Sequence, residues 1–166
     1  YGKIGLELTE KINRFINTNI KVISLSCGYD HTVIIDEDNY LWVTGDNILG
    51  QLGLETNGNE IHQFTNTNIK ATSVFCGSYS TTIIDEDNYL WVTGYNSCGE
   101  LGLGNTNDVN QFTKINIKVI SVSCGYKHTA IIDEDNNLWV TGDNEYGQLG
   151  LGNTNNVNQF TNTNIK

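Results

Sequence analysis

Carboxylates are the most concentrated chemical groups in this sequence, because one acidic stretch occurs three times. Ile-Ile-Asp-Glu-Asp-Asn stands at Ile34–Asn39, Ile83–Asn88 and Ile131–Asn136. Hard cations such as Ca²⁺ are bound by several carboxylate oxygens. An EF-hand loop, however, alternates its acids, has Gly at the sixth place and ends in Glu, whereas Asp36 is followed by Glu-Asp-Asn-Tyr-Leu-Trp. We therefore expect a solvated hairpin turn, with weak cation binding as the alternative.

Other chemically reactive residues form no recognisable catalytic pattern. His31 and His128 each precede Thr, but Ser80 takes this place in the second copy, so a role that needs one His per copy fails. A His hydrogen-bonded to neighbouring backbone is favoured. The segment Gly94–Glu100 does not match G-x-S-x-G, and Gly-Gln-Leu-Gly lacks the Lys of a phosphate-binding loop. The sequence thus predicts no catalytic residue, metal site or cofactor, and a protein that is not an enzyme.

Three of the four cysteines occupy equivalent places, and the fourth, Cys98, stands in a variable loop. Cys27, Cys76 and Cys124 are 49 and 48 residues apart. We expect equivalent positions of successive units to lie well apart, which disfavours disulfides between them. Without a C-x-x-C pair, a zinc site has no support. Buried free thiols in a reducing intracellular compartment, the cytoplasm or a virion, are predicted.

The spacing of the cysteines is the period of the whole chain. Trp42, Trp91 and Trp139 follow it, and the first 19 residues align with the end of the third unit. The predicted organisation is the end of one repeat (1–19), three full repeats (20–68, 69–116 and 117–164) and the start of another (165–166), in a longer polypeptide.

Each unit contains three short, β-branched, nearly continuously apolar runs and a weaker fourth run near His62–Asn68. Runs of this kind are typical of strands covered on both faces. Four short strands per period of about 50 residues predict an all-β fold, a β-propeller of three full blades plus partial blades. Closing the ring then requires further blades from the same chain or from other copies.

Composition excludes some classes of partner. The net charge is −10, and the nine basic residues are scattered, which argues against a nucleic-acid-binding surface and against an anionic membrane surface. No apolar run approaches the length of a transmembrane helix. Of the classes of partner considered, a protein is the one that the composition leaves open.

Three motifs carry a family resemblance. Ser-Cys-Gly-Tyr-Asp-His-Thr (Ser26–Thr32), Thr-Gly-Asp-Asn (Thr44–Asn47) and Gly-Gln-Leu-Gly-Leu-Glu (Gly50–Glu55), with their counterparts, resemble the repeat of the regulator of chromosome condensation family. The resemblance implies a seven-bladed propeller that serves as a binding platform. Known members include an exchange factor for the GTPase Ran and a plant ultraviolet-B photoreceptor. The photoreceptor's Trp after Cys-Gly is Tyr29, Ser78 or Tyr126 here, so light sensing is not implied. Similar repeats occur in amoeba-infecting giant viruses, a source that the Asn- and Ile-rich composition fits.

Differences between the three units indicate where a partner binds. Consecutive strands of a meander alternate in direction, so the loops after the first and third strands share one end of each blade, and the acidic turn lies at the other. Variation and tyrosines concentrate in these loops, as expected of a protein-binding rim, although unselected drift would vary them too. The predicted rim residues are Tyr29, Asp30, His31, Asp46, Tyr79, Tyr95, Tyr126, Lys127, Asp143, Glu145 and Tyr146.

We predict a non-catalytic protein-interaction propeller. One alternative is a guanine-nucleotide exchange factor for a small GTPase, although no wedge-like insertion is present in these residues. Another alternative is a structural component of a virion or other large assembly.

Overall fold

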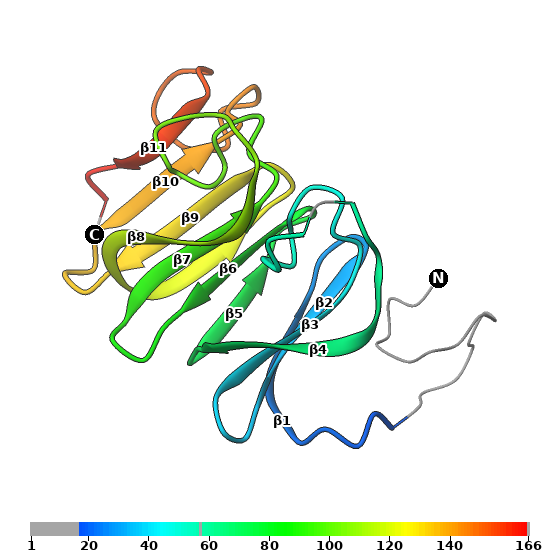
Figure 1. Ribbon diagram of the computed structural model, residues 1–166. Helices are drawn as coiled ribbons and strands as arrows, with labels where there is room; N and C mark the ends of the chain where they lie inside the picture. The colour runs from blue at the N-terminus through cyan, green and yellow to red at the C-terminus, as the bar shows by residue number, and fades with distance from the viewer. Residues whose placement is uncertain (1–16, 57, 166) are drawn as a thin grey trace.

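The computed structural model describes residues 17–56 and 58–165, and every regular element in them is a β-strand (Figure 1). None of these residues belongs to a helix that is long and apolar enough to span a membrane. The predicted partial repeat at residues 1–19 lies almost wholly outside the described residues. The strands are β1 (Val22–Cys27), β2 (His31–Asp36), β3 (Tyr40–Gly45), β4 (Ile61–Lys70), β5 (Ser73–Cys76), β6 (Ser80–Ile84), β7 (Tyr89–Gly94), β8 (Val109–Cys124), β9 (His128–Asp133), β10 (Leu138–Gly142) and β11 (Val157–Asn162).

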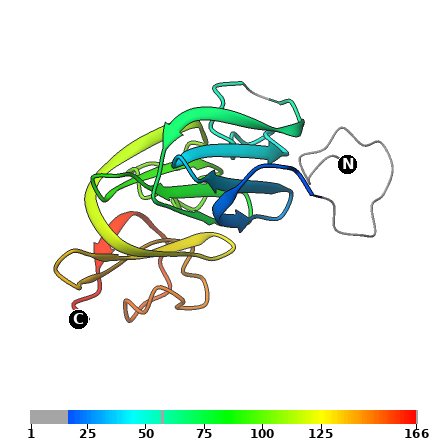
Figure 2. The same ribbon diagram turned by 90° about the horizontal axis from the view of Figure 1, so that it is seen from below.

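The strands form three antiparallel four-stranded blades. The first is a separate sheet in the order β1-β2-β3-β4, and the other two share a seven-stranded sheet. They share it because β8 is 16 residues long: its first part pairs with β7, and its last residues pair with β9. Figure 2 shows β8 curving from the second blade into the third. The run predicted as a weak fourth strand is the outer strand of each blade. The continuation of this strand from the second blade into the third was not predicted.

Burial follows the stacking of the blades. All five residues of β6, in the middle blade, are buried, because its two faces pack against the first and third blades. One apolar cluster, which includes Val33, Ile35 and Ile83, joins blades one and two. A second, which includes Leu90 and Ile131, joins blades two and three. Each fully buried side chain of this size contributes about 1.5–3 kcal/mol, so blade stacking explains the continuously apolar strands.

The acidic stretch forms the β2–β3 hairpin, and its first acid has a structural role. The Asp36 carboxylate accepts hydrogen bonds from the backbone N–H groups of Asp38 (3.0 Å) and Tyr40 (2.8 Å) and from Trp42 Nε1 (2.7 Å). Partial burial opposes ionisation, but these hydrogen bonds outweigh it and lower the pKa of Asp36. Asn39 closes the turn at φ 68°, a left-handed conformation that Asn tolerates better than most residues.

The same hairpin recurs in the other blades, where Trp91 Nε1 donates to Asp85 at 2.8 Å and Trp139 Nε1 to Asp133 at 2.7 Å. The prediction of a solvated turn therefore fits the two middle residues, Glu37 and Asp38 in the first copy, which are exposed. Asp36 is half-buried. In the described ranges, no group of three or more His, Cys, Asp or Glu side chains is placed to hold a metal ion.

The second and third blades each hold the loop of the blade before it through two threonine hydroxyls. Thr81 Oγ1 donates to the carbonyl of Gln51 (2.6 Å), and Thr93 Oγ1 donates to that of Gly50 (2.8 Å). Thr129 and Thr141 hold Glu100 and Gly99 in the same way, at 2.8 and 2.7 Å. We call this pair of bonds the inter-blade clamp. It explains why Thr recurs after the first-strand turn and before the Gly that ends the third strand.

Candidate protein-binding surface

The two variable loops of each blade lie side by side, as predicted. The backbone N–H of Asp46 donates to the carbonyl of Asp30 at 2.9 Å, and Tyr95 donates to Tyr79 at the same distance. In the third blade the corresponding bond, from Asp143 to Lys127, is 2.7 Å. This end of the blades is opposite the acidic hairpins (Figure 1).

Four tyrosines from three blades come together at this end. Tyr79 is central: its ring centroid lies 5.6 Å from that of Tyr29, 6.3 Å from that of Tyr95 and 6.4 Å from that of Tyr126. Two of the contacts are edge-to-face, an arrangement that aromatic quadrupoles favour. Tyr29 and Tyr126 remain 70% and 62% exposed. These four residues and Lys127 are called the tyrosine surface below.

Lys127 belongs to this surface because its ammonium lies over two of the rings. Its Nζ is 5.4 Å from the Tyr126 centroid and 5.8 Å from that of Tyr95, within the range of cation–π attraction. The pKa of Lys127 is raised, chiefly by its electrostatic interaction with Tyr95. The side chain is therefore a fixed positive charge at neutral pH.

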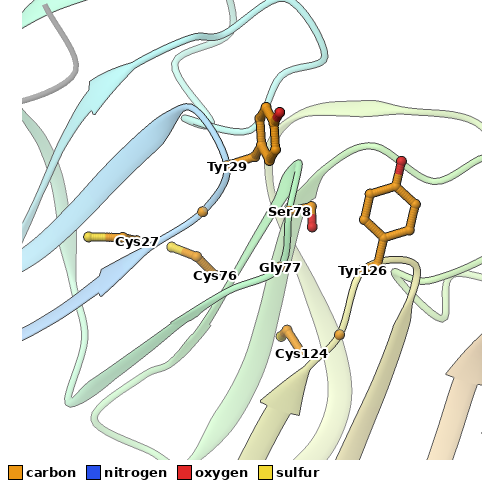
Figure 3. A pocket seen from close by; sticks show the side chains of 9 residues that line it. Cys27, Tyr29, Cys76, Gly77, Ser78, Cys124 and Tyr126 are labelled. Atoms are coloured by element: carbon orange, nitrogen blue, oxygen red, sulfur yellow. The ribbon is translucent and has the colours of Figure 1, made fainter.

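A pocket of about 440 Å³ opens beside the tyrosines, where the inner strands of the three blades end. The Cys-Gly steps of all three blades line it together with Tyr29, Ser78 and Tyr126. Figure 3 shows Tyr29 and Tyr126 on opposite sides of Ser78, with the cysteines deeper. We call it the central pocket.

The central pocket corrects one prediction about the cysteines. All four described cysteines are free, but the three equivalent ones do not lie well apart: they surround a single pocket. The prediction of a buried thiol is also wrong for Cys27, which is exposed. The blades share an axis, and inner strands converge on it. Burial raises the pKa of Cys76 to about 12 and also raises that of Cys124, so both remain neutral thiols.

His31, a predicted rim residue, lies inside the protein. It is only 2% exposed, and its Nε2 is 3.0 Å from Thr81 Oγ1. Because that hydroxyl donates to Gln51, His31 Nε2–H must be the donor in the His–Thr pair. Burial lowers the pKa of His31 to about 4. A Cβ on Gly28 would lie 2.0 Å from His31 Cε1, which explains the Gly that precedes this His in the motif.

The remaining predicted residues lie outside the tyrosine surface. Asp46 and Asp143 accept hydrogen bonds from the Nε2 atoms of Gln51 and Gln148, at 2.8 and 3.0 Å. Asp30 is half-buried beside the first of these loops. Glu145 and Tyr146 are exposed on the loop after β10, and Tyr146 is 85% exposed. The structure thus brings together five of the eleven predicted side chains.

Sequence reasoning missed the asparagine that shapes each variable loop. Asn47 is fully buried; its Oδ1 accepts from Leu52 N (2.9 Å), and its Nδ2 donates to the carbonyl of Thr56 (2.7 Å). Asn96 and Asn144 make the equivalent bonds to Leu101 and Leu149. The sequence did carry a signal for it: the second residue of this loop is Asn in all three repeats, whereas the residues around it vary.

The regulator of chromosome condensation (RCC1) repeat matches residues 22–51, 71–100 and 119–148, which together are more than half of the chain. The chain belongs to the RCC1 repeat family. A second form of the same repeat matches residues 87–132. An RCC1 repeat-containing protein of Schizosaccharomyces pombe is 55% identical over 31 residues, which are 19% of this chain and 9% of that protein.

Two solved structures have the same fold. Human WBSCR16 is similar with a TM-score of 0.78 and 21% identity, over 88% of this chain and 40% of that one. Yeast RCC1 (Prp20), in a structure bound to Kap60, has a TM-score of 0.78 and 22% identity, over 87% of this chain and 37% of that one. The predicted β-propeller fold is confirmed, and the chain spans about two fifths of these relatives.

Proposed function

We propose that this chain is a non-catalytic protein-interaction part of an RCC1-type propeller and that it binds its partner through the tyrosine surface. The observation that carries the proposal is the gathering of four tyrosines from three successive blades beside one pocket. Tyrosine is enriched where interfaces derive most of their binding energy, because it offers a large rigid area and a polar tip. These residues come from loops that differ between otherwise similar blades.

The state of the potential nucleophiles and bases supports a non-catalytic role. Burial keeps Cys76 and Cys124 as thiols, whereas an attacking cysteine needs to be a thiolate. His31 is occupied by its contact with the next blade. The three cysteines that line one pocket are free, which supports the proposal of a reducing compartment, the cytoplasm or a virion.

Relatives support a protein partner without naming it. Yeast RCC1 is described as bound to Kap60, and another of its structures is described with binding to Gsp1p and histones. Nucleotide exchange on a small GTPase and a structural role in a virion stay alternatives, and a giant-virus source stays a prediction. Accelerated release of labelled GDP from candidate GTPases would favour exchange, and fixed stoichiometry in purified particles would favour the virion role.

The test replaces Tyr29, Tyr79 and Tyr126 together by Ala and compares capture of partners from an extract of the native host. The matched control replaces Tyr40 and Tyr89, which lie at the opposite end near the acidic hairpins. We expect the triple variant to lose the partners that the wild type and the control retain, with unchanged circular dichroism. Equal capture by all three proteins would refute the assignment of the tyrosine surface.

A further inference from the structure

Lysines in this chain lie over aromatic rings. Four of the five described lysines do so, and the closest, Lys114 Nζ, is 3.5 Å from the centroid of Tyr89. At the end with the acidic hairpins, Tyr40 and Tyr89 are thus both covered by lysines of the same chain. Cation–π attraction is strongest for cations that approach the face of the ring. These contacts show that the tyrosine rings at this end bind cationic side chains of the same chain.

Tyr29 and Tyr79 differ from the other tyrosines with ring contacts. In residues 17–56 and 58–165, no lysine lies over either ring, while Lys127 covers Tyr95 and Tyr126 on the other side of the tyrosine surface. Tyr29 is 70% exposed and lines the central pocket. The exposed ring of Tyr29, whose centroid lies 5.6 Å from that of the half-buried Tyr79, is therefore accessible to a cation from outside this part of the chain.

Charge at this end also favours a cationic ligand. The variable segments of these six loops, residues 29–31, 46–49, 78–80, 95–98, 126–128 and 143–146, contain four acids and one lysine: Asp30, Asp46, Asp143 and Glu145 against Lys127. The whole chain has a net charge of −10. Such a surface attracts basic partners and repels acidic ones.

We propose that the partner presents an arginine on an extended segment, with the guanidinium against Tyr29 and Tyr79 at the mouth of the central pocket. Arginine fits better than lysine because its planar, weakly hydrated guanidinium stacks on aromatic faces. The pocket, at about 440 Å³, is within the range that holds a small organic group. This inference rests on the proposed function, since it assigns the chemistry of the partner at the same surface.

The test measures anisotropy of a fluorescein-labelled Gly-Ser peptide that carries a pair of arginines. The comparison peptides replace arginine by citrulline, which has the same shape without the charge, or by glutamate. We expect the arginine peptide to bind roughly 5- to 30-fold more tightly than the citrulline peptide, and the glutamate peptide to bind more weakly than both. Equal binding of the arginine and citrulline peptides, or no binding of either, would overturn the inference.

Variants locate the binding. Tyr29→Leu and Tyr79→Leu should each reduce the preference for arginine over citrulline by about fivefold, whereas Tyr146→Leu should leave it unchanged. The Tyr29 variant is informative even if the Tyr79 variant is unstable, because Tyr29 is largely exposed. An equal loss with Tyr146→Leu would also count against the site.

Failure of the inference is distinguishable from failure of the proposed function. If the triple tyrosine variant loses natural partners while the arginine preference is absent, the binding surface stands and its ligand chemistry is wrong. If natural partners bind the triple variant unchanged, both the surface and its assigned ligand are wrong.

Discussion

Replacing Glu100 by Gln and Tyr95 by Asp would restore in the second blade a pair that the other two blades contain. In those blades, the Gln side-chain oxygen accepts a backbone N–H, and its Nε2 donates to an Asp carboxylate; the pairs are Gln51–Asp46 and Gln148–Asp143. Glu100 accepts the backbone bond from Cys98 at 2.8 Å. Its Oε1 is buried without a hydrogen-bond partner among the described residues.

The energetic consequence follows from the burial of Glu100, which is 3% exposed. An unpartnered buried polar atom costs about 1–3 kcal/mol. Glu100→Gln alone removes the charge but leaves its amide without an acceptor, so the two effects nearly cancel. Tyr95→Asp alone places a second carboxylate beside the first and destabilises the fold. The double variant gains a hydrogen bond to a charged group, worth about 1.5–3 kcal/mol, so the coupling energy should be at least about 2 kcal/mol.

A double-mutant cycle by urea unfolding at pH 7 measures this coupling. The control makes the reverse exchange in the third blade, Gln148→Glu with Asp143→Tyr. Because Gln148 is exposed, its coupling should be below about 1 kcal/mol. A coupling within about 0.5 kcal/mol of zero in the second blade would refute the reasoning.

Burial raises the pKa of Glu100 above its unfolded value of 4.5. The protonated form is therefore favoured by folding, and the wild type loses stability as pH rises through the folded-state pKa. The stability of the double variant relative to the wild type should consequently shrink when unfolding is repeated below pH 4.5.

Three further changes test the packing between blades. The pKa of His31 falls from 6.5 to about 4 on folding, so stability is lost as pH drops from 6.5 towards 4, by about 3 kcal/mol; His31→Ser, the residue of the second blade, should flatten this part of a stability–pH curve. Gly28→Ala should lower the free energy of unfolding by about 1–3 kcal/mol, because the new methyl group overlaps the His31 ring, and an unchanged urea midpoint would contradict that overlap. Thr93→Val removes the hydroxyl that donates to the carbonyls of Gly50 and Val109 and should cost about 1–3 kcal/mol, and a loss below about 0.5 kcal/mol would show that the clamp contributes little.

Internal repetition made the blades predictable because it aligned strands and turns within one chain. The positions of Trp42, Trp91 and Trp139 defined the period, and the alternation of strand direction placed the variable loops together. The tyrosine surface follows from that placement, since Tyr29, Tyr79, Tyr95 and Tyr126 all come from such loops.

Distances between blades were not predictable in the same way. A repeat alignment shows that Cys27, Cys76 and Cys124 are equivalent, but only the common axis shows that they meet. The position of His31 in the sequence indicates a loop residue. Its ring nevertheless packs in the interior, because Gly28 has no Cβ to occupy that space. The buried carboxyl of Glu100 was also missed, because its surroundings come from two blades.

The threonine hydroxyls of the inter-blade clamp donate their hydrogen bonds to main-chain carbonyls rather than to side chains. An exposed side chain of the loop that precedes Gly50 and Gln51, such as that of Ile48, can therefore be exchanged without altering the atoms that Thr93 and Thr81 hold. In each such loop, the main-chain carbonyls hold neighbouring blades together, and the exposed side chains determine what the surface can bind. Blades built in this way can acquire a new binding specificity by substitutions at their rim while the contacts that stack them stay constant.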